Sequence, residues 1–138
     1  MRLLPTALTL IALATSALAD STEPLPQITL TGGEGVVVPG TRFTLLLTEV
    51  TDQRCPANVD CYWEGMQRAK ITVMTPKPEL LQVVLCNLCD DGTSSAEVPG
   101  LKLFLGGLVP STEELAKLGR EPLLTDYKLI VTYLPVSN

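Results

Sequence analysis

Residues 68–73 of this chain read Arg-Ala-Lys-Ile-Thr-Val, a strict alternation of polar and apolar side chains. Successive side chains of a β-strand point to opposite faces of its sheet. The alternation therefore predicts a strand that buries Ala69, Ile71 and Val73 and leaves its other face in water. We expect a fold built from sheets that each bury one face.

The same alternation recurs on both sides of this stretch. Apolar side chains alternate within residues 43–47, 80–86 and 101–105, and shorter candidate strands lie at 27–31 and 35–38. The segment 127–134 is apolar on both faces except for Lys128 and Thr132, so we expect a central strand there.

Turn residues separate these stretches, and they lie at Gly32-Gly33, Pro39-Gly40, 76–78, Asp91-Gly92, Pro99-Gly100 and Gly106-Gly107. About seven short strands joined in this way predict an all-β fold, an immunoglobulin-like antiparallel β-sandwich. A small closed barrel has the same pattern and is the alternative.

One segment departs from the alternation. Residues 111–119 begin with the capping residue Ser111, continue with acidic residues and end at Gly119, which predicts a helix of about two turns. Leu115 and Leu118 lie three apart on one face. We expect a short crossover helix over an open end of the sandwich, because two apolar residues make a poor docking face for a binding helix.

The N-terminus predicts export. Residues 1–19 have a positive charge at Arg2, an apolar stretch over 3–13 and the sequence Ala-Leu-Ala at 17–19, so we expect signal peptidase to cleave before Asp20. The apolar stretch is shorter than the ~20 residues of a membrane span, and residue 20 is not a lipidation cysteine. We expect a single domain over 20–138, secreted or periplasmic, without a membrane anchor.

The charge balance limits the partners and the chemistry. The chain has 10 basic and 15 acidic residues and a net charge of −5, which argues against nucleic acid or an anionic membrane surface as a partner. It has no histidine, so Ser-His and Cys-His pairs are absent. We therefore expect a non-enzymatic protein without a cofactor.

The four cysteines form an even set in an exported chain, the setting in which disulfides form and persist. We favour the pairs Cys55–Cys61 and Cys86–Cys89. The second pair needs a turn at 87–88, because two residues three apart on an extended strand lie roughly 10 Å apart, beyond bridging distance. The alternative arrangement links each of Cys55 and Cys61 to one cysteine of the second pair.

The spacing of Cys86 and Cys89 also matches thiol–disulfide oxidoreductases. Those enzymes place the first cysteine at a helix N-terminus, which lowers its pKa. Here the motif follows a strand-like run and precedes Asp90-Asp91, so we prefer a structural bond. A thiol redox protein and a metal-binding protein are the alternatives, although the spacing of the four thiols is loose for zinc and we predict no metal site.

Residues 49–65 resemble a pattern of small exported bacterial β-sandwich domains, many of them uncharacterised or lipoproteins. The pattern has the form Asp-x-Arg-Cys-Pro, a few residues, then Cys-x-Trp and a glycine before a charged alternating strand. The matching positions are Asp52, Arg54, Cys55, Pro56, Val59, Cys61, Trp63 and Gly65. The resemblance implies a β-sandwich with a Cys55–Cys61 disulfide and no established activity. It assigns no role to Cys86 and Cys89, and Glu64 stands where a small residue is usual.

The segment 54–65 is the candidate binding site for a protein or a cell-envelope component. Its candidate contact residues are Arg54, Asn58, Asp60, Tyr62, Trp63 and Glu64. We expect Trp63 to pack beneath the loop as a plug at the sandwich edge rather than to serve as a stacking platform. A specialised alternative is a protease inhibitor that presents Arg54 to a trypsin-like pocket. Nothing in the sequence selects an oligomeric state.

Overall fold

The computed structural model of the protein describes residues 23–90 and 92–137. The predicted signal peptide, its cleavage site and Asp91 lie outside the described residues. Within the described part of the chain, no helix is long and apolar enough to cross a membrane.

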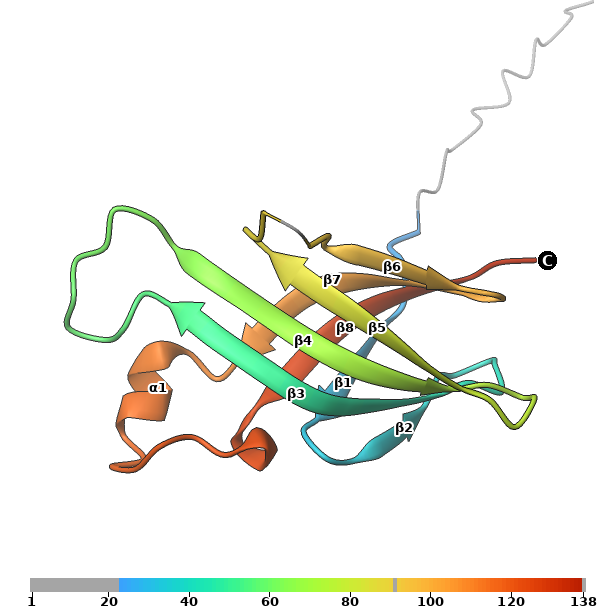
Figure 1. The fold of residues 1–138 in the computed structure, drawn as a ribbon, viewed down its shortest axis with the longest axis horizontal. Helices are drawn as coiled ribbons and strands as arrows, with labels where there is room; N and C mark the ends of the chain where they lie inside the picture. The colour runs from blue at the N-terminus through green and yellow to red at the C-terminus, as the bar shows by residue number, and fades with distance from the viewer. Residues whose placement is uncertain (1–22, 91, 138) are drawn as a thin grey trace, which may run out of the picture.

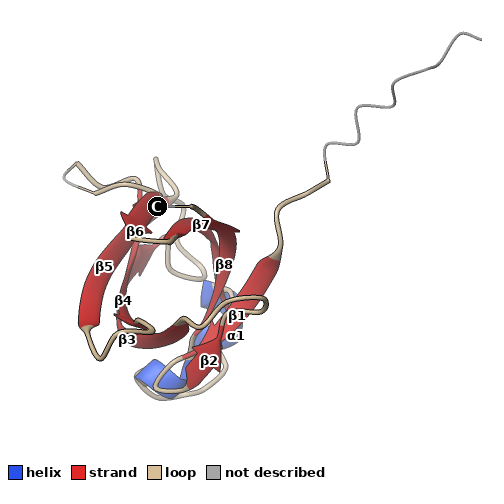
Figure 2. Ribbon diagram, turned by 90° about the vertical axis from the view of Figure 1, so that its right-hand side faces the viewer, coloured by secondary structure: helices blue, strands red, loops and turns tan. Residues whose placement is uncertain are grey.

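Two four-stranded antiparallel sheets form the fold, so the predicted all-β sandwich is confirmed. One sheet has the order β1 (Gln27–Thr31), β8 (Lys128–Pro135), β7 (Leu101–Val109), β6 (Ser95–Val98). The other has the order β2 (Gly35–Val37), β3 (Thr44–Arg54), β4 (Gly65–Met74), β5 (Leu80–Asn87). Figures 1 and 2 show the two sheets as facing layers. The described residues contain eight strands, one more than expected.

The alternating stretch 68–73 lies in the middle of β4 and builds the core as predicted. Ala69, Ile71 and Val73 are buried, and Leu45 and Leu47 of β3 are buried beside them. The opposite sheet contributes its own buried row, which includes Leu101, Leu103, Leu129 and Val131. Each fully buried Leu or Ile contributes about 1.5–3 kcal/mol relative to exposure, so this double row is the main source of stability. As predicted, β8 is a central strand, between β1 and β7.

Two strand assignments differ from the sequence prediction. The prediction of a turn at Gly106-Gly107 is wrong, because β7 continues through both glycines with a register shift between Leu105 and Gly107. A Cβ on Gly106 would lie 2.9 Å from the Ile130 carbonyl oxygen of β8, so glycine is needed there to admit the neighbouring strand. Strand β6 was not predicted at all.

The helix is shorter than predicted. Helix α1 covers Thr112–Ala116 and begins with a capping box: the Glu114 N–H donates to Ser111 Oγ at 3.2 Å, and the Ser111 N–H donates to Glu114 Oε2 at 2.9 Å. Leu115 is buried, whereas Leu118 lies past the helix and is exposed. A 3-10 turn, η1 (Leu124–Asp126), follows before β8. As Figure 1 shows, α1 lies at the same end of the sandwich as the connection from β3 to β4.

Candidate functional site

The β3–β4 loop, residues 55–64, extends past the end of the sandwich (Figure 1). Cys55 and Cys61 are joined by a disulfide with their Cα atoms 5.9 Å apart, which closes residues 55–61 into a ring. Asn58 has φ 65°, a left-handed conformation that asparagine tolerates and that turns the chain back. The Cys55 N–H donates to the Glu64 carbonyl at 3.1 Å, so β-type pairing continues one step into the loop.

The tip of this loop is exposed over seven consecutive residues, 58–64. The structure brings together there five of the six predicted contact residues, namely Asn58, Asp60, Tyr62, Trp63 and Glu64. The Tyr62 side chain is fully exposed, and Trp63 is 62% exposed. The expected packing of Trp63 beneath the loop is therefore wrong, because the loop carries this side chain outward. Together with Val59, the Tyr62 and Trp63 side chains give the loop an exposed apolar tip.

Arg54, the sixth predicted contact residue, points into the sandwich. Its Nε and Nη2 atoms donate to the two carboxylate oxygens of Asp52 at 2.8 Å each. Its Nη1 donates to the Leu108 carbonyl and its Nη2 to the Pro110 carbonyl, both at 2.8 Å. The side chain is only 16% exposed. The alternative of a protease inhibitor presenting Arg54 is wrong, because a protease would have to break all four hydrogen bonds to reach the guanidinium.

Asp52 and Arg54 form a clamp between the two sheets. Both side chains share one face of β3, since they are two residues apart, and the guanidinium reaches the end of β7. Burial by itself raises the pKa of Asp52, but the hydrogen bonds and charge of Arg54 outweigh it and hold that pKa below its usual value. The pKa of Arg54 is raised, chiefly by its hydrogen bond to Asp52. Both groups stay charged.

The spacing of Asp52 and Arg54 in the sequence is consistent with this clamp. An Asp and an Arg two apart on a strand lie on the same face. Sequence alone places Asp52 beside the loop with Asp60 and Glu64, where a solvated carboxylate is the expectation, and places Tyr127 at the start of the last strand. The structure instead pairs Asp52 with Arg54. Burial and the neighbouring Asp52 carboxylate raise the pKa of Tyr127.

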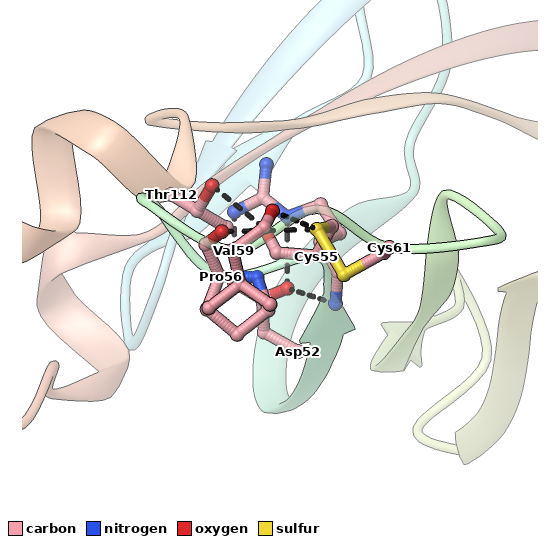
Figure 3. The surroundings of a disulfide bond; sticks show 7 residues. Asp52, Cys55, Pro56, Val59, Cys61 and Thr112 are labelled. Carbon is pink, nitrogen blue, oxygen red and sulfur yellow. Dashed lines mark hydrogen bonds and ion pairs between the residues drawn. A yellow bond between two sulfur atoms is a disulfide. The ribbon is translucent and has the colours of Figure 1, made fainter.

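A second contact fixes the base of the loop from the helix side. The Thr112 hydroxyl, at the start of α1, donates to the Cys55 carbonyl at 3.0 Å, and Figure 3 shows Thr112 beside Cys55 and Pro56. Between the loop base and α1 lies a cleft of about 370 Å³, to which Pro56, Leu115 and Arg120 contribute. The loop is therefore held at its root by both the Asp52–Arg54 clamp and Thr112.

Cys86 and Cys89 form the second disulfide, with their Cα atoms 5.9 Å apart. The turn that this bond requires is present, because Leu88 has φ 60°. Cys86 is 2% exposed at the end of β5, and Gly92 folds back so closely that a Cβ there would lie 2.7 Å from the Cys86 Cβ. A thiol oxidoreductase needs an accessible first cysteine, in the known enzymes at a helix N-terminus. Neither condition holds here.

Two other findings bear on alternative sites. No group of three or more His, Cys, Asp or Glu side chains that could hold a metal ion occurs in residues 23–90 and 92–137. At the far end of the sandwich, an apolar cleft of about 360 Å³ is lined in part by Phe43, Pro76, Leu81 and Pro99. Its charged neighbours, Lys77 and Glu79, belong to the exposed β4–β5 turn.

Comparisons with protein-family models, with curated protein sequences and with solved structures return no significant match to this chain. The resemblance of residues 49–65 to small exported bacterial domains thus stays a prediction.

Proposed function

We propose that this protein is an exported, non-enzymatic binding module that inserts the tip of its β3–β4 loop into a pocket of a partner protein. The observation that carries the proposal is the pair of exposed aromatic side chains, Tyr62 and Trp63, on a loop whose root is fixed. Trp and Tyr dominate the binding energy of protein interfaces.

The Tyr62 and Trp63 side chains do not belong to the core of the sandwich. Burying a large aromatic side chain stabilises a fold, and the core here is completed by other residues. Exposed aromatic side chains that gather at one place favour an interaction site over a solvated surface.

The fixed root supports binding in a second way. A loop that is already ordered loses less conformational entropy when it binds. The Cys55–Cys61 disulfide, the Asp52–Arg54 clamp and the Thr112 hydrogen bond all restrict the loop before it meets a partner. Both disulfides also fit an oxidising compartment, the periplasm or the medium.

The shape of the site favours a protein over an envelope polysaccharide. The loop projects from the end of the molecule (Figure 1), so the partner has to supply the concave surface. Folded proteins have such pockets, lined mainly by apolar side chains, whereas an extended glycan has none to offer.

The test is capture of partners from the exported-protein fraction of the source organism on the immobilised mature protein. We expect Tyr62→Ala and Trp63→Ala to lose the captured partner. Leu80→Ala is the matched control, because Leu80 is an equally exposed apolar side chain on β5, outside the loop. Retention of every partner by Trp63→Ala would sink the proposal.

A further inference from the structure

The loop tip combines its aromatic side chains with negative charge. Asp60 and Glu64 flank Tyr62 and Trp63, both carboxylates belong to exposed residues, and residues 55–64 contain no lysine or arginine. The apolar tip is thus rimmed by carboxylates on its own segment.

The neighbouring α1 connection, residues 110–127, adds to this charge rather than offsetting it. Glu113 and Glu121 are exposed there, and Glu121 borders the cleft that Pro56 of the loop also lines. Of its cations, Arg120 is bound through both Nη atoms to the carboxylate of Asp126, at 2.6 and 2.9 Å. Lys117 lies near Glu114 and helps to lower its pKa, after the hydrogen bonds from Ser111.

Arg54, the cation at the root of the loop, adds little positive charge to the surface. Its side chain is mostly buried, and its charge is matched by that of Asp52. A partner that meets the loop tip therefore encounters two aromatic side chains and an excess of carboxylates.

We infer that the partner is a protein whose receiving pocket is surrounded by lysine and arginine. This inference rests on the proposed function and adds the charge of the partner to it. The aromatic side chains supply apolar contact at the centre, while Asp60 and Glu64 meet basic groups at the rim. Rim charges steer encounter and discriminate between partners, and a carboxylate rim would repel acidic surfaces.

The experiment uses the partner captured from the exported-protein fraction, purified, and measures its dissociation constant for the mature protein by calorimetry. The test variant is the double substitution Asp60→Lys/Glu64→Lys. The control, Glu79→Lys/Glu97→Lys, makes the same change in net charge at exposed residues of the far end of the sandwich. Circular dichroism and the unfolding midpoint verify that both variants are folded.

We expect the Asp60→Lys/Glu64→Lys variant to bind about tenfold more weakly, and the control to bind as the wild type does. Wild-type binding should also weaken between about 50 and about 300 mM NaCl. The Debye length shortens over this range, so salt screens the attraction between the charges at the rim of the interface.

The outcomes separate this inference from the proposed function. If Trp63→Ala abolishes binding but reversal of Asp60 and Glu64 does not weaken it, the inference is overturned and the binding loop stands. Absence of any partner that depends on Trp63 overturns both. Capture of a glycan instead of a protein overturns the inference as well.

Discussion

Arg54 shows how one side chain can connect distant parts of the chain. Its guanidinium joins Asp52 on its own strand to the carbonyl of Leu108 in the opposite sheet and to that of Pro110, just past the end of β7. An ion pair with this little exposure is expensive to break from one side, because the remaining charge stays buried without a partner.

Arg54→Ala should therefore lower the free energy of unfolding by roughly 3 kcal/mol. Denaturant unfolding of the purified mature protein measures it. Arg120→Ala is the control, because the Arg120–Asp126 pair is solvent-exposed, and its loss should be clearly smaller. Equal losses in the two variants would contradict the clamp.

Asp52 should make stability depend on pH in the acidic range. Its folded pKa lies below the usual 3.8, so the folded state binds its proton less readily than the unfolded state does. The stabilisation is present above about pH 4 and is lost as pH falls through the lower, folded value.

Unfolding measured between neutral pH and about pH 2 should show this loss in the wild type and a flatter profile in Asp52→Asn. The hydrogen bond from Arg120 lowers the pKa of Asp126 to about 2. Asp126 therefore contributes equally to the pH dependence of stability in the wild type and in Asp52→Asn. Parallel profiles for the two proteins would refute the role of Asp52.

At the scale of the element, the β3–β4 loop depends on its disulfide. The Cys55–Cys61 bond closes a short loop, for which the entropy model gives about 2 kcal/mol. Cys55→Ser/Cys61→Ser should lose about that much free energy of unfolding, and protease should cut within residues 56–60 faster than in the wild type. Limited proteolysis with mass mapping checks it, and unchanged cleavage would mean that the other contacts alone order the loop.

The strands show what alternation can and cannot predict. Stretches with a clean period of two, such as 68–73, became buried strands because one face had to leave water. Strand β6 was missed because Ser95–Val98 is short and half polar. The Gly106-Gly107 pair reads as a turn, yet a bulge uses glycine for the same reason, and only the position of β8 distinguishes the two.

The site was predictable in its location and not in its orientation. The cysteines and the turn residue Asn58 indicate a closed loop from sequence alone. Whether Trp63 points inward or outward, and whether Arg54 faces solvent, depends on the opposite sheet and on α1, which pack against β3 only in the folded chain. The sequence of the loop itself does not specify these contacts with residues far away along the chain.

At the scale of the whole molecule, folding and binding should be separable. The core lies between the sheets, and the β3–β4 loop extends past their end (Figure 1). Trp63→Ala should change the free energy of unfolding by less than about 0.5 kcal/mol, as is usual for surface positions. Denaturant unfolding tests this, and a large destabilisation would mean that Trp63 packs against the fold after all.

The thiol content of the protein isolated from its native compartment should be zero. Both pairs are bonded in the structure, and Cys86 is buried. Alkylation without reductant should leave the intact mass unchanged, and non-reducing peptide mapping should recover the pairs 55–61 and 86–89. Ready alkylation of Cys86 and Cys89 would instead revive a redox role for them.

The root of the loop is built almost entirely from groups outside residues 56–60. Asp52, Arg54 and Thr112 hold it through side chains and backbone that do not depend on which residues occupy the tip. Apart from position 58, where the left-handed turn favours asparagine or glycine, the positions between Cys55 and Cys61 can therefore diverge without disturbing the sandwich. Evolution, or a protein engineer with a randomised library, can treat this segment as an exchangeable cassette on an unchanging scaffold.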